Sequence, residues 1–339
     1  MTALLAHLRF IVAALALVFV VAIAAPAAAQ QPSSVNPTAA AVQEDQLLNA
    51  LRGGGVIDGR VTIPDAKSAV LIQPAGLDWR HFHQVTLQRV GAVAIIGVFA
   101  LLILFFLVRG RIRLASGFSG QTILRFNAFE RFMHWMTAVS FIVLGLSGLN
   151  LTFGKSLLLP YISPEAFTAL SQWGKYAHNY LSFPFALGVI FMFLIWIKDN
   201  FPTGTDVQWL KQGGGLVGQA HPPARRFNAG QKIIFWIVIL GGTAVSVSGY
   251  YLMFPFYETG IAWMQFWQIV HALVAVLMVA AILAHIYIGT IGMEGAYQAM
   301  STGQVDVNWA KEHHSLWAEK ELGKTAGAPP AQGRMAPAE

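Results

Sequence analysis

Residues 265–293 read QFWQIVHALVAVLMVAAILAHIYIGTIGM, an almost wholly apolar run long enough to cross a bilayer as one helix. The run carries two histidines, His271 and His285, which lie roughly 21 Å apart along a helix axis. Their fourteen-residue spacing is close to four full turns, so both rings project from one stripe. An imidazole inside a membrane is costly without a partner and marks a functional site by default. Two on one face, near opposite membrane surfaces, predict two stacked metal centres.

The composition is that of a membrane protein. Of the 339 residues, 55% are hydrophobic and only 11% are charged, against about 25% charged in soluble domains. The net charge of +6 is explained by basic loops that orient membrane helices, so no nucleic-acid partner is expected. The chain has no cysteine, which excludes disulfides, thiolate-bound iron–sulfur clusters and covalently attached haem. Histidine is left as the expected metal ligand.

A signal peptide and one exported segment are predicted at the start of the chain. Residues 1–29 have the short basic start, apolar core and Ala-Ala-Ala ending of a cleavable signal peptide, with an uncleaved membrane anchor as the alternative. Residues 30–88 begin as a linker and contain too few core residues to fold alone. We expect them to be periplasmic, extended and ordered by a partner.

Five transmembrane helices are predicted: Val90–Val108, Phe132–Phe153, Tyr180–Ile197, Ile233–Phe254 and Gln265–Met293. Arginine and lysine crowd the loops after the first and third helices, which places these loops in the cytoplasm. The C-terminal tail, residues 294–339, is then cytoplasmic too. The chain is predicted to be an all-α integral protein of the bacterial inner membrane. Its membrane domain spans residues 125–293, and residues 89–110 form one extra N-terminal transmembrane helix.

Four histidines fall in or at the edge of these helices. By depth, His134 pairs with His285 near the cytoplasmic side, and His178 pairs with His271 near the periplasmic side. Two such pairs are what two b-type haems require, since each iron takes two axial imidazoles. The competing interpretation is four separately hydrogen-bonded structural histidines. Gly145 and Gly148 lie on the face of His134 but deeper, where a second haem needs a smooth wall; small-residue helix packing also explains them.

The motif RRFNAGQK, residues 225–232, directly precedes the fourth helix. Asn228 is placed to cap this helix, with Gln231 completing a capping box. The same amides at the membrane edge are also suited to bind a quinone carbonyl, with Gly230 permitting close approach. The sequence leaves both interpretations open.

With these pieces assembled, the chain resembles the cytochrome b (gamma) subunit of membrane-bound formate dehydrogenases. The matching motifs are ERFMHW at 130–135, KYAHN at 175–179, RFNAGQK at 226–232, IVHALVAVLMVAAILAHIYIG at 269–289 and NWAKEHHSLW at 308–317. The resemblance covers residues 125–317 and does not extend to the signal peptide, residues 30–88 or the first helix.

The resemblance implies a four-helix transmembrane di-haem cytochrome b bundle. It also implies two haem b groups, with His178 and His271 holding one iron and His134 and His285 the other. Asn228, Gly230 and His285 would line the site of a quinone, ubiquinone or menaquinone. The partners would be the iron–sulfur (beta) and catalytic molybdenum or tungsten (alpha) subunits.

Such a subunit carries electrons to quinone and does not itself oxidise formate. One alternative is a related cytochrome b of a nickel–iron hydrogenase or a thiosulfate-type reductase. A second alternative, from another class, is a haem-free membrane anchor or transporter subunit.

Overall fold

The computed structural model describes residues 74–216, 221–255 and 260–326. The chain divides into two compact units, Met1–Thr86 with Asn150–Tyr176 and Leu87–Leu149 with Ala177–Glu339. The predicted signal peptide and residues 30–73 lie outside the described residues. All candidate site residues belong to the second unit.

Five helical stretches in the described part of the chain are long and apolar enough to cross a membrane. They are Asp78–Arg109, Ala128–Leu157, Pro164–Asp199, Ala229–Met253 and Ile261–Gly292. Their number and order agree with the five helices predicted from hydropathy, and the all-α membrane architecture is confirmed. Each stretch is longer than the apolar run from which it was predicted. A helix ends at its capping residues and not at the point where its sequence becomes polar.

Within the first unit, the residues before the apolar run that begins at Val90 are helical. Helix α3 (Pro74–His81) leads into the π-helical turn η1 (Phe82–Thr86). The prediction of an extended segment is therefore wrong for residues 74–86. No Gly or Pro interrupts the chain between Gly76 and Gly91, and Trp79 stacks on Phe82 one turn later with ring centroids 5.9 Å apart.

Capping residues decide where two of the long helices begin. Helix α5 (Ala128–Leu157) starts in a reciprocal capping box: Asn127 Oδ1 accepts from Glu130 N, and Glu130 Oε2 accepts from Asn127 N, both at 2.9 Å. Helix α6 (Pro164–Trp196) begins at a proline, a favoured first residue, after Ser163 caps it. It therefore starts at Pro164 and not at Tyr180, where the apolar run begins.

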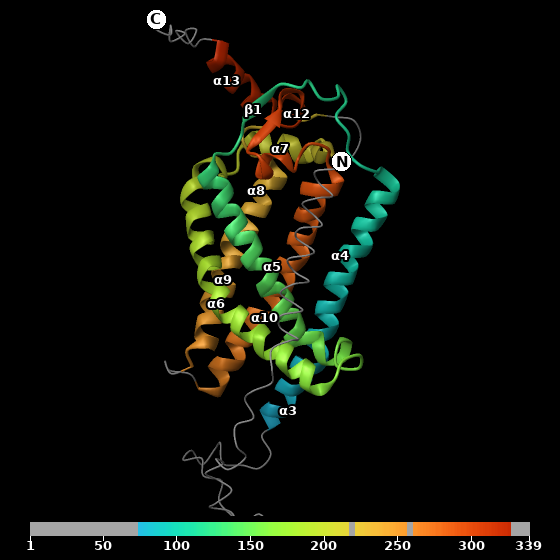
Figure 1. Ribbon diagram of the computed structural model, residues 1–339, viewed down its shortest axis with the longest axis vertical. Helices are drawn as coiled ribbons and strands as arrows, with labels where there is room; N and C mark the ends of the chain where they lie inside the picture. Colours follow the sequence, from blue (N-terminus) through green and yellow to red (C-terminus); the bar gives the residue numbers. More distant parts are fainter. Residues whose placement is uncertain (1–73, 217–220, 256–259, 327–339) are drawn as a thin grey trace, which may run out of the picture. The chain divides into compact units, whose positions relative to one another are not determined.

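In the second unit, four helices follow the same general direction as α5 and α6 (Figure 1). These are α4 (Leu87–Arg109), α8 (Ala229–Trp236), α9 (Gly242–Met253) and α10 (Ile261–Tyr287). Helix α10 packs against both α4 and α9. The π-helical turns η4 (Ile237–Gly241) and η5 (Ile288–Gly292) join α8 to α9 and end α10.

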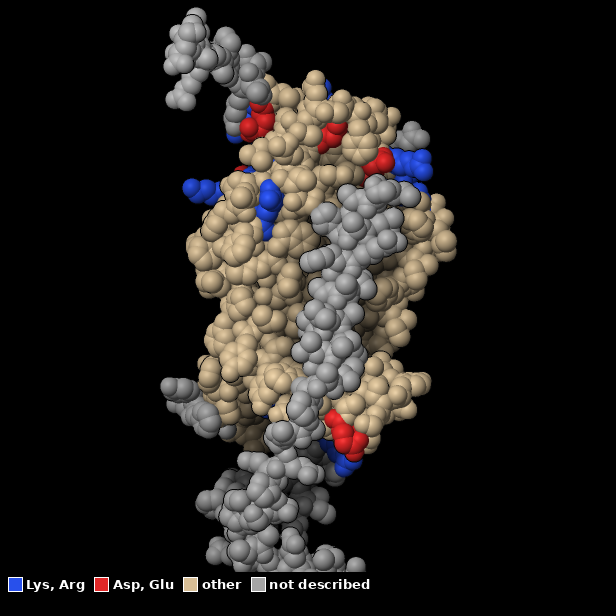
Figure 2. Space-filling view, viewed as in Figure 1, with Lys and Arg blue, Asp and Glu red and all other residues tan. Residues whose placement is uncertain are grey.

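Short elements gather at one end of these helices, which we call the sheet end (Figure 1). Strands β1 (Thr122–Leu124) and β2 (Gln304–Asp306) pair antiparallel there, with Ile123 opposite Val305. The remaining elements are η2 (Ile197–Asp199), α7 (Gly204–Lys211), η3 (Gly213–Gly215), α11 (Gln298–Ser301), α12 (Val307–His313) and α13 (Ser315–Ala326). On the visible face, charged side chains lie at the sheet end, and the helices next to it show an uncharged band (Figure 2).

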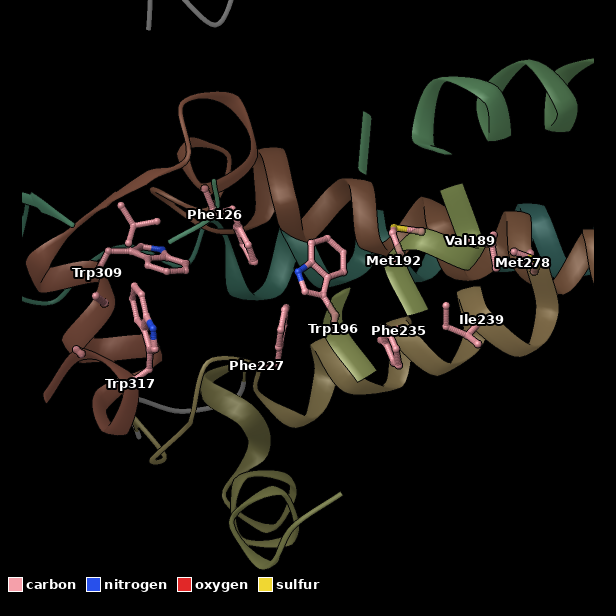
Figure 3. Packing of buried hydrophobic residues seen from close by; sticks show 14 of the residues in the cluster. Phe126, Val189, Met192, Trp196, Phe227, Phe235, Ile239, Met278, Trp309 and Trp317 are labelled. Carbon is pink, nitrogen blue, oxygen red and sulfur yellow. The ribbon is translucent and has the colours of Figure 1, made fainter. Parts of the chain in front are cut away.

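One hydrophobic cluster runs from the sheet end into the helices (Figure 3). Phe126, Trp196 and Phe227 join its two parts, with ring centroids 5.6 to 5.9 Å apart. Deeper in, the fourth helix approaches its neighbours at a pair of glycines. A Cβ on Gly241 would lie 2.9 Å from Met278 Sδ, and one on Gly242 would lie 2.9 Å from a methyl group of α6.

Candidate functional site

The four membrane histidines meet in two pairs. His134 of α5 faces His285 of α10, with ring centroids 6.2 Å apart and ring planes at 61°. His178 of α6 faces His271 of α10, with centroids 6.0 Å apart and planes at 60°. The structure brings together the two pairs that the depth argument predicts. Their role as metal ligands stays a prediction.

The first pair consists of one partly buried and one exposed histidine. His285 is exposed although it belongs to a membrane-length helix and its ring faces His134. Nδ1 of His134 is buried without a hydrogen-bond partner in the described part of the chain. The imidazole ring lies edge-on to Trp135, with centroids 5.3 Å apart.

The second pair is held by serine hydroxyls. Ser147 Oγ lies 2.9 Å from Nδ1 of His178, and Ser248 Oγ lies 3.1 Å from Nδ1 of His271. The main-chain carbonyl of Val245 is 3.0 Å from the latter nitrogen. A carbonyl only accepts, so Nδ1 of His271 carries the proton and Nε2 keeps its lone pair for a metal.

Small residues flank the same pair. A Cβ on Gly148 would lie 3.7 Å from Cε1 of His178, and a Cβ on Gly249 would lie 3.1 Å from Cε1 of His271. The sequence interpretation placed Gly148 at this depth and missed Gly249 and both serines. The signal that identifies them is a repeated dipeptide, Ser-Gly at 147–148 and at 248–249, on the two helices that face the histidines.

The donor set fits haem iron. Metal–imidazole bonds are about 2 Å long, and two of them in line place the ring centroids roughly 6 Å apart. Both observed separations agree with this value. Among the described residues no group of three or more His, Cys, Asp or Glu side chains is placed to hold a metal ion. Sites with only two protein ligands suit a metal whose other ligands come from a porphyrin.

The amide motif forms the predicted cap. Asn228 Oδ1 accepts from Gln231 N at 2.9 Å, and Gln231 Oε1 accepts from Asn228 N at 3.1 Å, at the start of α8. Gly230 has a packing reason to be glycine, because a Cβ there would lie 3.2 Å from the ring of Trp209. The capping interpretation is confirmed, and the quinone interpretation stays a prediction.

A small polar cavity adjoins Asn228 at the sheet end. Its volume is about 10 Å³, close to the space of one water molecule. Trp209, His221, Glu312 and His313 are among its lining residues. Nε2 of His313 is buried there without a partner in the described part of the chain. Burial is the main cause that lowers the pKa of His313 to about 4.

A buried arginine fastens the C-terminal helices beside this cavity. Arg125 is only 3% exposed and lies against the rings of Trp309 and Trp317, at 5.3 and 5.0 Å. Its guanidinium lies 3.0 Å from Nε2 of His314, whose Nδ1 donates to the carbonyl of Arg225 at 2.8 Å. Burial, followed by the charge of Arg125, lowers the pKa of His314 well below its usual range, so this histidine is a neutral acceptor. The sequence interpretation assigned none of these roles, although NWAKEHHSLW contains three of the residues.

The fold and the paired histidines define a helical, multi-pass membrane cytochrome of the b type. A family model described as prokaryotic cytochrome b561 matches residues 125–303, just over half of the chain, and the protein belongs to this family. Membership implies haem b. Helix α4 and everything before it lie outside the matched region.

The relatives are formate dehydrogenase subunits. The chain is 30% identical over 208 residues to the formate dehydrogenase cytochrome b556(fdo) subunit of Escherichia coli K12, covering 60% of this chain and 95% of that protein. It is 27% identical over 202 residues to the nitrate-inducible cytochrome b556(Fdn) subunit of the same strain, covering 58% and 90%. For the cytochrome b556 subunit of Haemophilus influenzae the values are 25% over 208 residues, 59% and 84%. The resemblance inferred from the motifs is confirmed.

Proposed function

We propose that this protein is the membrane-anchoring, di-haem electron-transfer subunit of a formate dehydrogenase complex. The observation that carries the proposal is the pair of facing imidazoles at each of two depths along α10. The similarity to formate dehydrogenase cytochrome b556 subunits over 95% of one relative supports the identity of the complex. A hydrogenase or thiosulfate-type reductase subunit would use the same pairs with another donor.

His178 and His271 would hold one haem b, and His134 and His285 the other, each through a neutral imidazole ring; for His271 the metal-binding nitrogen would be Nε2. Haem b supplies reversible one-electron transfer. Helix α10 sets the distance between the two sites, since His271 and His285 lie fourteen residues and about 21 Å apart. Electrons would cross most of the membrane between the two pairs.

The partners would carry the remaining chemistry. The chain has no cysteine for iron–sulfur clusters, so the iron–sulfur and catalytic molybdenum or tungsten subunits must be separate chains. Basic loops and the signal peptide support a periplasmic position for residues 30–88 and a cytoplasmic C-terminus. Protease added outside spheroplasts should then cut within residues 30–88 when the partners are absent. If that segment is cut only by protease on the cytoplasmic side, the proposed orientation is wrong.

Quinone would be reduced at the sheet end, close to the His134–His285 pair. Asn228, Gly230 and Gln231 are the proposed quinone residues, with Trp209 against Gly230 as a wall. The polar cavity beside Asn228 supports this position, because quinone reduction consumes two protons as well as two electrons. Protons taken from the cytoplasm, with electrons moving inward, would build a membrane potential without a proton channel.

A pyridine haemochrome assay on the purified intact chain tests the proposal. We expect two haem b per chain, both low-spin, and reduction of both by formate in the complete complex. One haem or none would refute the di-haem proposal and favour a haem-free anchor. Reduction of the haems by hydrogen but not by formate would assign the subunit to a hydrogenase. Reoxidation of quinol-reduced haems by thiosulfate would assign it to a thiosulfate-type reductase.

A further inference from the structure

Ser147 of α5 uses its hydroxyl in two directions. Its single hydrogen is within donating distance of two carbonyls on the preceding turn, that of Val143 at 2.7 Å and that of Leu144 at 3.1 Å. Toward Nδ1 of His178, 2.9 Å away, the oxygen is therefore the acceptor, and the imidazole donates. The proton of His178 is thus held on Nδ1.

Ser248 of α9 repeats this arrangement. Its hydroxyl donates to the carbonyl of Ala244 at 2.7 Å, and its oxygen lies 3.1 Å from Nδ1 of His271. The carbonyl of Val245 accepts from the same nitrogen at 3.0 Å. Each histidine of this pair therefore faces a serine, and His271 also faces the carbonyl three residues before its serine. Ser248 is fully buried, so water does not compete for its hydroxyl.

The other pair has no such support. Nδ1 of His134 is buried without a hydrogen-bond partner among the described residues. An imidazole that donates its second N–H is a more basic ligand and stabilises the more highly charged state of a metal. The two pairs consequently differ in the electron density that they offer to a bound iron.

We propose that Ser147 and Ser248 are positioning residues that lower the midpoint potential of the haem held by His178 and His271. The proposal rests on the haem ligation put forward above. The ferric iron carries the extra positive charge, so stronger donation from the two imidazoles favours the oxidised form. The haem at the His134–His285 pair keeps the higher potential.

The difference sets a direction for electron flow. Electrons that arrive at the His178–His271 pair run downhill to the His134–His285 pair, beside the proposed quinone site. This order of potentials does not depend on which way the chain lies in the membrane.

A redox titration of the two haem bands in the intact complex tests the proposal. Ser147→Ala should raise the potential of one band and leave the other unchanged. Changes in hydrogen bonding around metal ligands shift metal equilibria by tenfold or more, and tenfold is 59 mV for a one-electron couple. Ser248→Ala should shift the same band in the same direction. The shift in potential of either single variant should be smaller than that of the double variant Ser147→Ala with Ser248→Ala.

Two controls separate tuning from general disturbance. Thr137→Val removes a buried hydroxyl of α5 that bonds only its own helix, at 2.8 Å to the carbonyl of Met133, and should leave the band in place. Ser147→Thr keeps a hydroxyl and should restore the wild-type potential. An unmoved band in both alanine variants that retain full haem content would overturn the proposal, as would an equal shift of both bands.

The two proposals fail in distinguishable ways. If the wild-type chain lacks two bis-histidine haems by spectroscopy, the proposed function is wrong. If the haems are present and His178→Ala removes the band that the serine variants leave unmoved, only the tuning role is wrong. If Ser147→Ala loses haem, the proposal is tested with Ser248→Ala instead, because the carbonyl of Val245 still orients His271 in that variant.

Discussion

For Asn228, an experiment can separate a structural role, capping α8, from a functional role, binding a quinone. Its Oδ1 caps α8 by accepting from Gln231 N at 2.9 Å, so Asn228→Ala should cost about 1 kcal/mol of helix stability. As a quinone ligand its NH2 group would donate to a carbonyl oxygen. No hydrogen bond from that group is seen in the described part of the chain.

A neutral hydrogen bond contributes about 0.5–1.5 kcal/mol, and 1.4 kcal/mol is tenfold in affinity. Loss of the donor should therefore weaken quinone binding about threefold to tenfold. Asn228→Asp is the matched variant, because aspartate caps a helix as well as asparagine does but has no NH2 group.

The assay is stopped-flow reoxidation of formate-reduced haem by a quinone analogue, normalised to haem content. We expect both variants to be reduced normally and to require several-fold more quinone for half-maximal reoxidation. Only Asn228→Ala should also lower the thermal midpoint. Wild-type quinone dependence in both variants would refute the quinone role and leave Asn228 as a cap alone.

Two further predictions concern the histidines. His178→Ala and His271→Ala should each halve the haem content and abolish the same spectral component, while alanine at either His134 or His285 should abolish the other; a component shared by His134 and His178 would contradict the pairing. The pKa of His313, lowered to about 4 by burial, means that its neutral form stabilises the folded sheet end above the unfolded pKa of about 6.5. This stability should decline as pH falls from about 6.5 toward 4, seen as faster amide exchange in α12. His313→Gln should reduce that dependence and leave the part contributed by buried His314, and an unchanged pH profile in this variant would contradict the prediction.

The sequence was sufficient for features that depend on local periodicity. Five apolar runs predicted the five membrane-length helices, and the fourteen-residue spacing of His271 and His285 predicted two levels on one stripe. Asn228 with Gln231 predicted the cap that the structure contains. Each of these follows from helix geometry and from the cost of polar groups in hydrocarbon.

The sequence was less successful in predicting where helices start and which structure the exported segment adopts. The apolar run marked Tyr180, whereas the helix begins at Pro164 behind its Ser163 cap. Residues 74–86 were expected to be extended and are helical. Hydropathy measures what a bilayer accepts, but backbone caps and breakers decide where a helix ends.

Other features depend on which helices become neighbours. Ser147 contacts His178 and Ser248 contacts His271 only because α5 lies beside α6 and α9 beside α10. Trp209, which explains Gly230, comes from a different helix, and the rings around Arg125 come from the C-terminal tail. Side-chain periodicity assigns a residue to a face of its own helix and carries no information about the residue opposite.

The sequence by itself thus determined the class of protein, the number of membrane helices and the depth of each histidine, because these depend on hydropathy and on the rise of one helix. Tertiary structure decided which rings face each other at 6.0 and 6.2 Å, which of their nitrogens donate to serine, and which remain without a partner. Those properties arise from contacts between separate helices, and such contacts are set by packing across the whole unit.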